Sequence, residues 1–81
     1  MRLADPLRKG RYVASCREST PLLAAMNGHL QIWPWAVAVS DGDWVRFYID
    51  DKLVWECNAH YAGANFSCRR IRGGKVSRRS S

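Results

Sequence analysis

The sequence predicts a small α+β domain: an antiparallel β-meander of three to five strands, open, curled or closed into a small barrel, with one short helix packed on one face. Three observations predict this class. From residue 30 onward, apolar and polar residues alternate with the period of two that is typical of strands. Turn-forming residues such as Asp-Gly separate the alternating runs. Before them, a Thr-Pro start and a Gly stop bracket one short helical run.

The helix is expected between Thr20 and Gly28. Thr20 can accept hydrogen bonds from the free amides of the first turn, and Pro21 suits the first helical position. Gly28 supplies the left-handed residue that commonly ends a helix. A helix of about two turns is not stable alone. We therefore expect its apolar residues, Leu22, Leu23 and Met26, to pack on the rest of the domain.

Five segments carry the residue types of strands. The expected strands are residues 11 to 16, 31 to 39, 44 to 49, 53 to 58 and 65 to 71. The first hairpin turn contains an Asp-Gly pair, which favours a two-residue loop because both central positions need positive φ. The expected pairs of this hairpin are Val39 with Trp44, Val37 with Arg46 and Trp35 with Tyr48.

The second turn, Asp50-Asp51-Lys52, is compatible with a loop of two or three residues, and the two lengths bring opposite strand faces together. A two-residue loop would place Glu56 beside apolar residues. A three-residue loop instead gives the pairs Ile49 with Leu53, Phe47 with Trp55, Val45 with Cys57 and Arg46 with Glu56. We therefore expect the three-residue loop.

These registers give the sheet two apolar faces. The first face, where the helix is expected, carries Ala36, Ala38, Val45, Phe47, Ile49, Leu53, Trp55 and Cys57. The second carries Trp33, Trp35, Val37, Val39, Trp44, Tyr48 and Val54, with Arg46 and Glu56 as its charges. A face this rich in large aromatics is not left in water, because each buries up to ~150–250 Å². It must be covered by the segments at residues 11 to 16 and 61 to 71, by a second copy, by a ligand or by another macromolecule.

The formal net charge of +6 is located at one end of the chain. Residues 1 to 68 contain equal numbers of basic and acidic residues, so their charges cancel. The remaining cations are Arg69, Arg70, Arg72, Lys75, Arg78 and Arg79. We therefore divide the chain into an N-terminal arm (residues 1 to 10), a single compact domain (residues 11 to 68) and a basic C-terminal tail (residues 69 to 81).

Compartment and chemistry are constrained by what the cysteines and histidines can do. Three cysteines cannot all pair, and the N-terminus lacks the apolar core of a secretory signal, so we expect a cytoplasmic protein. No apolar run approaches the ~20 residues of a membrane helix, so no membrane association is expected. Cys57, His60 and Cys68 form a weak zinc pattern without a paired Cys-x2-Cys knuckle. No catalytic constellation is recognised, and neither a metal nor a cofactor is expected.

The leading hypothesis is a non-enzymatic interaction module that self-associates through its aromatic face, with a homodimer favoured over another protein partner. The contact residues would be Trp33, Trp35, Val37, Val39, Trp44, Arg46 and Tyr48. The alternative is an RNA- or DNA-binding protein that uses the six tail cations together with the aromatic face. A second alternative is a small ribonuclease toxin of the RelE type, which would share the size, basic end and short helix on an antiparallel sheet, although no residues match that family's catalytic pattern.

Overall fold

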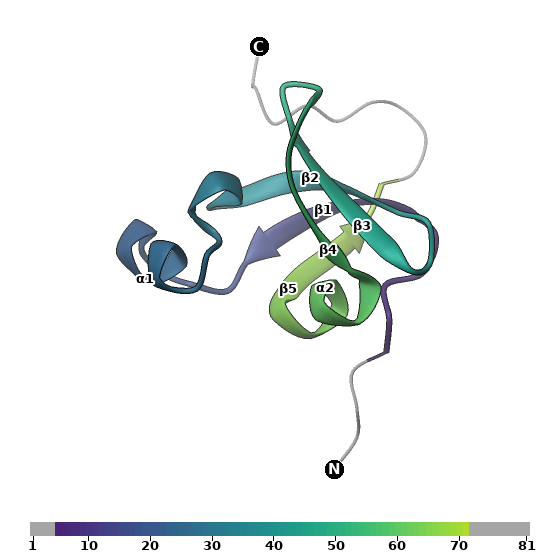
Figure 1. Cartoon of the computed structure of the whole chain (residues 1–81), viewed down its shortest axis with the longest axis horizontal. Helices are drawn as coiled ribbons and strands as arrows, with labels where there is room; N and C mark the ends of the chain where they lie inside the picture. The colour runs from purple at the N-terminus through teal and green to yellow at the C-terminus, as the bar shows by residue number, and fades with distance from the viewer. Residues whose placement is uncertain (1–4, 72–81) are drawn as a thin grey trace.

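The computed structural model describes residues 5 to 71, which form one five-stranded antiparallel sheet in the order β4-β3-β2-β1-β5 (Figure 1). The strands are β1 (Gly10–Cys16), β2 (Trp35–Ser40), β3 (Trp44–Ile49), β4 (Lys52–Asn58) and β5 (Phe66–Arg70). The first four strands make a meander, and helix α2 (Ala59–Asn65) then carries the chain across to β5, beside β1. The sheet is not closed into a barrel. The expected α+β class with a small antiparallel meander is confirmed.

The first hairpin has the expected loop length but a different centre. Its two loop residues are Gly42 and Asp43, because the backbone N–H of Asp41 donates to the carbonyl of Trp44 at 3.0 Å. The carboxylate of Asp41 also accepts from the amides of Asp43 and Trp44, at 2.9 and 2.8 Å. The observed pairs are Val37 with Tyr48, Ala38 with Phe47, Val39 with Arg46 and Ser40 with Val45. The expected pairs were therefore wrong by two residues, a shift that leaves every side chain on its expected face.

The second hairpin contains a β-bulge that the sequence analysis did not anticipate. Away from the turn the expected register is correct, with the pairs Val45 with Cys57, Arg46 with Glu56 and Phe47 with Trp55. Near the turn the pairs become Tyr48 with Leu53 and Ile49 with Lys52. The loop has two residues rather than three, since Asp50 and Asp51 both take positive φ, 52° and 65°, as a type I′ turn requires. Val54 is the extra residue of the bulge, so the pairing of Ile49 with Leu53 was wrong.

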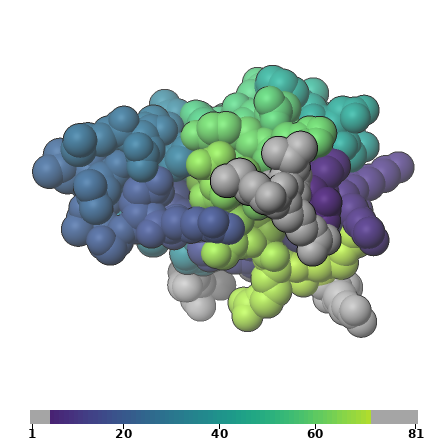
Figure 2. Space-filling model, turned by 90° about the horizontal axis from the view of Figure 1, so that it is seen from below, coloured from purple at the N-terminus to yellow at the C-terminus, as the bar shows by residue number. Residues whose placement is uncertain are grey.

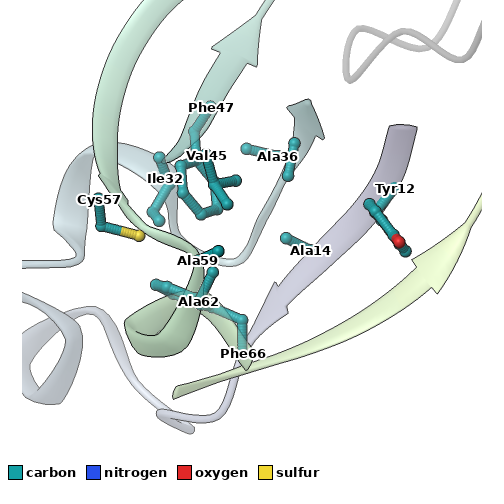
Figure 3. Packing of buried hydrophobic residues seen from close by; sticks show 11 residues of the cluster. Tyr12, Ala14, Ile32, Ala36, Val45, Phe47, Cys57, Ala59, Ala62 and Phe66 are labelled. Atoms are coloured by element: carbon teal, nitrogen blue, oxygen red, sulfur yellow. The ribbon is translucent and has the colours of Figure 1, made fainter. Parts of the chain in front are cut away.

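One side of the sheet, which we call the core face, holds the buried core. Small residues of the inner strands and large residues of β3 meet there with α2 and with the short 3-10 helix η1 (Leu30–Ile32) (Figure 3). The buried members include Ala14, Ala36, Ala38, Val45, Phe47, Ile32, Ala59, Ala62 and Phe66. Ala59 and Ala62 are fully buried and allow α2 to approach the strands closely. The helix that packs on the sheet is thus α2.

Helix α1 (Pro21–Met26) forms with the expected capping but not in the expected place. The hydroxyl of Thr20 accepts from the amide of Leu23 at 3.2 Å, and Gly28 has a φ of 78°. Figure 1 shows α1 beyond one end of the strands, and Figure 2 shows it with its flanking residues as a lobe beside the sheet. Leu22 and Met26 are 70% and 74% exposed. The expectation that the apolar residues of this helix pack on the sheet was therefore wrong.

Strand β2 begins later than predicted. Residues 30 to 32 form η1, and the peptide bond between Trp33 and Pro34 is cis, so the strand starts at Trp35. Trp33 lies outside the sheet, and its indole N–H donates to the carbonyl of Glu18 at 3.0 Å. The period-two alternation that placed Trp33 beside Trp35 does not extend across this bend.

At both predicted domain boundaries, the chain is hydrogen-bonded to the rest of the domain. In the arm, the amide of Leu7 donates to the carbonyl of Ala59 at 3.0 Å, and the Ser40 hydroxyl donates to the carbonyl of Leu7 at 2.7 Å. At the other boundary, Arg69 and Arg70 are residues of β5.

Within residues 5 to 71, no helix is long and apolar enough to cross a bilayer.

Candidate functional site

The candidate site is the side of the sheet opposite the core face, which we call the open face. The helical elements that contact β3, β4 and β5 are α2 and η1, and their buried residues Ile32, Ala59 and Ala62 belong to the core. Cross-strand pairing and alternation assign the following residues to the open face: Arg11, Val13, Ser15, Trp35, Val37, Val39, Trp44, Arg46, Tyr48, Leu53, Glu56, Ser67 and Arg69.

The open face is organised in rows that cross the strands. One row runs through Leu53, Tyr48, Val37, Val13 and Arg69. A second runs through Glu56, Arg46, Val39 and Arg11, and a third through Trp35, Ser15 and Ser67. Aromatic side chains therefore occupy the half formed by β2 and β3, whereas hydroxyls and two arginines occupy the half formed by β1 and β5.

The predicted contact residues are brought together with one exception. Trp35, Val37, Val39, Trp44, Arg46 and Tyr48 share the open face, whereas Trp33 does not. Val37, at the centre, is only 6% exposed, and Trp44 at the end of β3 is 39% exposed. The Trp44 indole N–H donates to Oε1 of Glu56 at 2.6 Å, an oxygen that also lies 4.0 Å from Nε of Arg46.

The open face has a basic excess. Arg46 is balanced by Glu56 across the β3–β4 pair, 4.0 Å away. Arg11 and Arg69 are exposed, and neither makes an ion pair with another residue between 5 and 71. An anion can therefore approach both guanidinium groups without displacing a carboxylate.

A hollow of about 300 Å³ lies between β1 and β5 on this face. It is lined by Val13, Ser15, Ser67, Cys68 and Arg69. Ser15 and Ser67 are direct cross-strand partners. Neither hydroxyl has a hydrogen-bond partner in the described part of the chain. Among residues 5 to 71, its lining thus combines two hydroxyl donors with one guanidinium and includes no acidic residue.

Arg70, also a candidate nucleic-acid contact, points to the opposite side. Its guanidinium lies 5.3 Å from the centre of the Tyr12 ring and donates to the carbonyl of Lys9 and to the Tyr12 hydroxyl, at 2.9 and 3.2 Å. A Cβ on Gly10, whose φ is 152°, would lie 2.8 Å from Nη1 of this guanidinium. Arg70 is therefore engaged in packing. The candidates Arg72, Lys75, Arg78 and Arg79 lie outside the described residues.

The weak zinc candidates do not converge. Cys57 is buried in the core, where desolvation raises the pKa of its thiol to about 11. Burial also raises the pKa of Cys68, and His60 is exposed on α2. Among residues 5 to 71, no group of three or more His, Cys, Asp or Glu side chains is placed to hold a metal ion.

A buried polar cluster, which no sequence pattern indicated, surrounds His29. This imidazole is 1% exposed, with Nδ1 3.0 Å from Oε2 of Glu18 and Nε2 2.7 Å from the Tyr61 hydroxyl. The ring packs against Trp55 and Phe66, at centroid distances of 5.5 and 4.8 Å. The backbone amide of His29 donates to the carbonyl of Ala24, in the preceding helix α1, at 2.7 Å. The side chain instead ties the α1 lobe to α2.

Electrostatics within this cluster favour a charged Glu18. Burial raises the pKa of its carboxyl, but hydrogen bonds from Asn27, the backbone and His29 outweigh the burial and hold the pKa below its usual value. The Asn27 amide donates to Oε2 at 2.8 Å, whereas Oε1 is buried and has no hydrogen-bond partner within residues 5 to 71. Burial raises the pKa of the Tyr61 hydroxyl, so this group stays protonated and can donate to the imidazole.

Comparison with known proteins identifies no relative: no family model, no curated protein and no solved structure matches the chain. Function must therefore be argued from the geometry and chemistry of the open face.

Proposed function

We propose that this protein is a small nucleic-acid-binding module that holds a single strand on its open face. The observation that carries the proposal is the row that places Tyr48 and Arg69 on one face, next to the hollow with Ser15 and Ser67. Proteins that bind single strands combine aromatic stacking positions with cationic contacts to the phosphate backbone. Both components are present on adjoining halves of this face.

The aromatic half offers stacking positions that are already ordered. Trp35 and Tyr48 are half-buried on neighbouring strands, β2 and β3. Stacking of one base on such a ring contributes about 1–3 kcal/mol and tolerates any base. Tyr48 and Arg69 are three strand spacings apart, which corresponds to roughly 14 Å. A single nucleic-acid strand whose bases stack on the aromatic side chains of β2 and β3 can therefore extend its phosphates toward β1 and β5.

The charge distribution favours a single strand over a duplex. Proteins that read duplex DNA commonly insert a helix or a two-stranded ribbon into the major groove. Neither α1 nor α2 contains a lysine or an arginine. Arg11 and Arg69 lie on the open face without an acidic partner among residues 5 to 71, and the chain continues from β5 into a basic segment. The proposal includes the cytoplasmic location expected from three unpaired thiols.

Self-association through the open face is the second candidate. It is favoured by the exposed apolar side chains of Val39, Trp44 and Leu53 on the half formed by β2, β3 and β4. It is disfavoured by the charges of the face, which include three arginines and one glutamate, because two copies packed face to face bring like charges together. Light scattering over a range of concentrations tests it. A dimer that Trp44→Ala dissociates would support this candidate.

The nucleic-acid proposal is tested by fluorescence anisotropy of the full chain with labelled RNA and DNA single strands of roughly 12 nucleotides. We expect Tyr48→Ala to weaken binding about fivefold or more, through the lost stacking contact. We expect Arg69→Ala to weaken it as well and to lower the slope of log affinity against log salt by about 0.7.

Lys52→Ala is the matched control, since it removes one exposed positive charge at the tip of β4, away from the hollow. It should leave affinity within about twofold. Equal losses for Arg69→Ala and Lys52→Ala would contradict the proposal. A second pair of results would also contradict it. If Tyr48→Ala leaves the affinity of the full chain unchanged, and removal of residues 72 to 81 abolishes binding, then the tail alone binds the nucleic acid.

A further inference from the structure

We propose that the hollow between β1 and β5 is a subsite for the terminal phosphate of the bound strand. This inference rests on the proposed function and assigns one part of the open face to one chemical group. It is carried by three features: an arginine without an acidic partner, two hydroxyls without partners, and a hollow large enough to admit a phosphate.

The donors of the hollow match the acceptors of a phosphate monoester. Ser15 and Ser67 are opposite each other on adjacent strands, so their Cβ atoms are about 5 Å apart. Each hydroxyl can donate to a different oxygen of one phosphate. The Arg69 guanidinium, which lines the same hollow, adds a fork of N–H donors that suits a second pair of oxygens.

Charge separates a terminal phosphate from an internal one. A phosphate monoester carries about −1.5 to −2 charges at pH 7 and exposes three acceptor oxygens, whereas a phosphodiester carries one charge and exposes two. The described lining residues include one cation and no acid, so the more highly charged group gains more binding energy. A neutral ligand would leave the guanidinium without a counter-charge.

The position of the hollow favours the end of a strand. Strand β5 is at the edge of the sheet, and Arg69 is the last residue of the row that begins at Leu53 and Tyr48. A nucleic-acid strand that follows this row from the aromatic half reaches the hollow at the edge of the sheet. No further strand of the described sheet lies beyond it to stack another base.

The test compares the affinity of the full chain for strands of one sequence that carry a 5′-phosphate, a 3′-phosphate or hydroxyls at both ends. We expect one phosphorylated strand to bind roughly tenfold more tightly than the strand with two hydroxyl ends, because charge-assisted hydrogen bonds are added. Ser15→Ala combined with Ser67→Ala should abolish this preference, so that the phosphorylated and unphosphorylated strands bind this variant with equal affinity. Lys52→Ala should keep the preference.

Competition with inorganic phosphate tests whether the hollow binds the terminal phosphate group itself rather than the rest of the nucleic-acid strand. At millimolar concentration it should reduce the affinity for the phosphorylated strand toward that for the unphosphorylated one, and have little effect on the latter. Equal affinity for all three strands would overturn the inference while leaving the proposed function intact. Absence of binding to any strand would overturn both.

Discussion

The Tyr61→Phe substitution removes one hydroxyl and leaves the ring contacts of residue 61 in place. The ring lies 5.9 Å from Trp55 and 6.2 Å from Phe66, and these contacts need no hydroxyl. What disappears is the 2.7 Å hydrogen bond to Nε2 of His29. The substitution therefore leaves Nε2 of His29, a buried ring nitrogen, without its hydrogen-bond partner.

The magnitude follows from the burial of His29. Because the imidazole is 1% exposed, its Nε2 depends on the Tyr61 hydroxyl for its hydrogen bond. A buried polar group left unsatisfied costs about 1–3 kcal/mol. A domain of this size rarely has more than about 3–5 kcal/mol of stability from its core alone. The loss is thus a large fraction of the free energy of unfolding.

Urea unfolding followed by tryptophan fluorescence measures this loss. With an m-value of about 1 kcal/mol/M, the midpoint should fall by roughly 1–3 M. Tyr48→Phe is the control, since the Tyr48 hydroxyl has no hydrogen-bond partner between residues 5 and 71, and it should change stability by less than about 0.5 kcal/mol. Equal effects of the two substitutions would refute the view that the His29 cluster holds the α1 lobe to α2.

Three further predictions concern pH, packing and reactivity. The pKa of Glu18 is depressed in the folded state, so its contribution to stability is complete above its unfolded pKa of about 4.5 and is lost as pH falls below it; Glu18→Gln should flatten an acid titration of the urea midpoint in this range. Gly63→Ala would place a methyl group against the backbone carbonyl of Asp5, so we expect it to destabilise the fold by about 1–3 kcal/mol, measured by thermal unfolding, and an unchanged Tm would contradict this packing. Burial raises the pKa of Cys57 to about 11, so its thiol should react with iodoacetamide at pH 8 far more slowly than in urea, and equal rates in the two conditions would show that it is not buried.

Local patterns predicted the elements better than their packing. The capping residues Thr20 and Pro21 identify α1, yet the same pattern says nothing about where a six-residue helix docks. Helix α2 has a comparable start, since the carboxamide of Asn58 accepts from the amide of Tyr61 at 2.7 Å. The sequence did not predict α2 because its apolar and polar residues do not recur with the 3.6-residue period of a helix. Its stability comes from burial of two alanines against the sheet.

The hairpins show which part of a register is readable from sequence. Side-chain alternation determines the face of a residue where the pairing is regular, and the faces of Val37, Phe47 and Arg46 were predicted correctly. Beside the bulge the prediction was wrong, because Leu53, expected on the same face as Phe47, pairs with Tyr48 on the open face. Turn chemistry determines the centre of the hairpin, and there Asp41 flanks the first loop rather than occupying it. Because of the bulge at Val54, the second hairpin has a two-residue loop and, farther from the turn, the apolar pairs that were expected from a three-residue loop.

The sequence alone favours self-association, whereas we now propose nucleic-acid binding, because the structure contains long-range contacts that no local sequence pattern reveals. From β2, β3 and β4 alone, the open face is an aromatic surface with one arginine and one glutamate, which suits self-association. Arg11 and Arg69 join it through the pairing of β1 with β2 and with β5, and more than half of the chain lies between β1 and β5. Pairing over that distance depends on α2 crossing the core face, which the sequence did not predict. Once it is in place, the same face carries two arginines without acidic partners among the described residues, and the partner that its charge favours is an anion rather than a second copy.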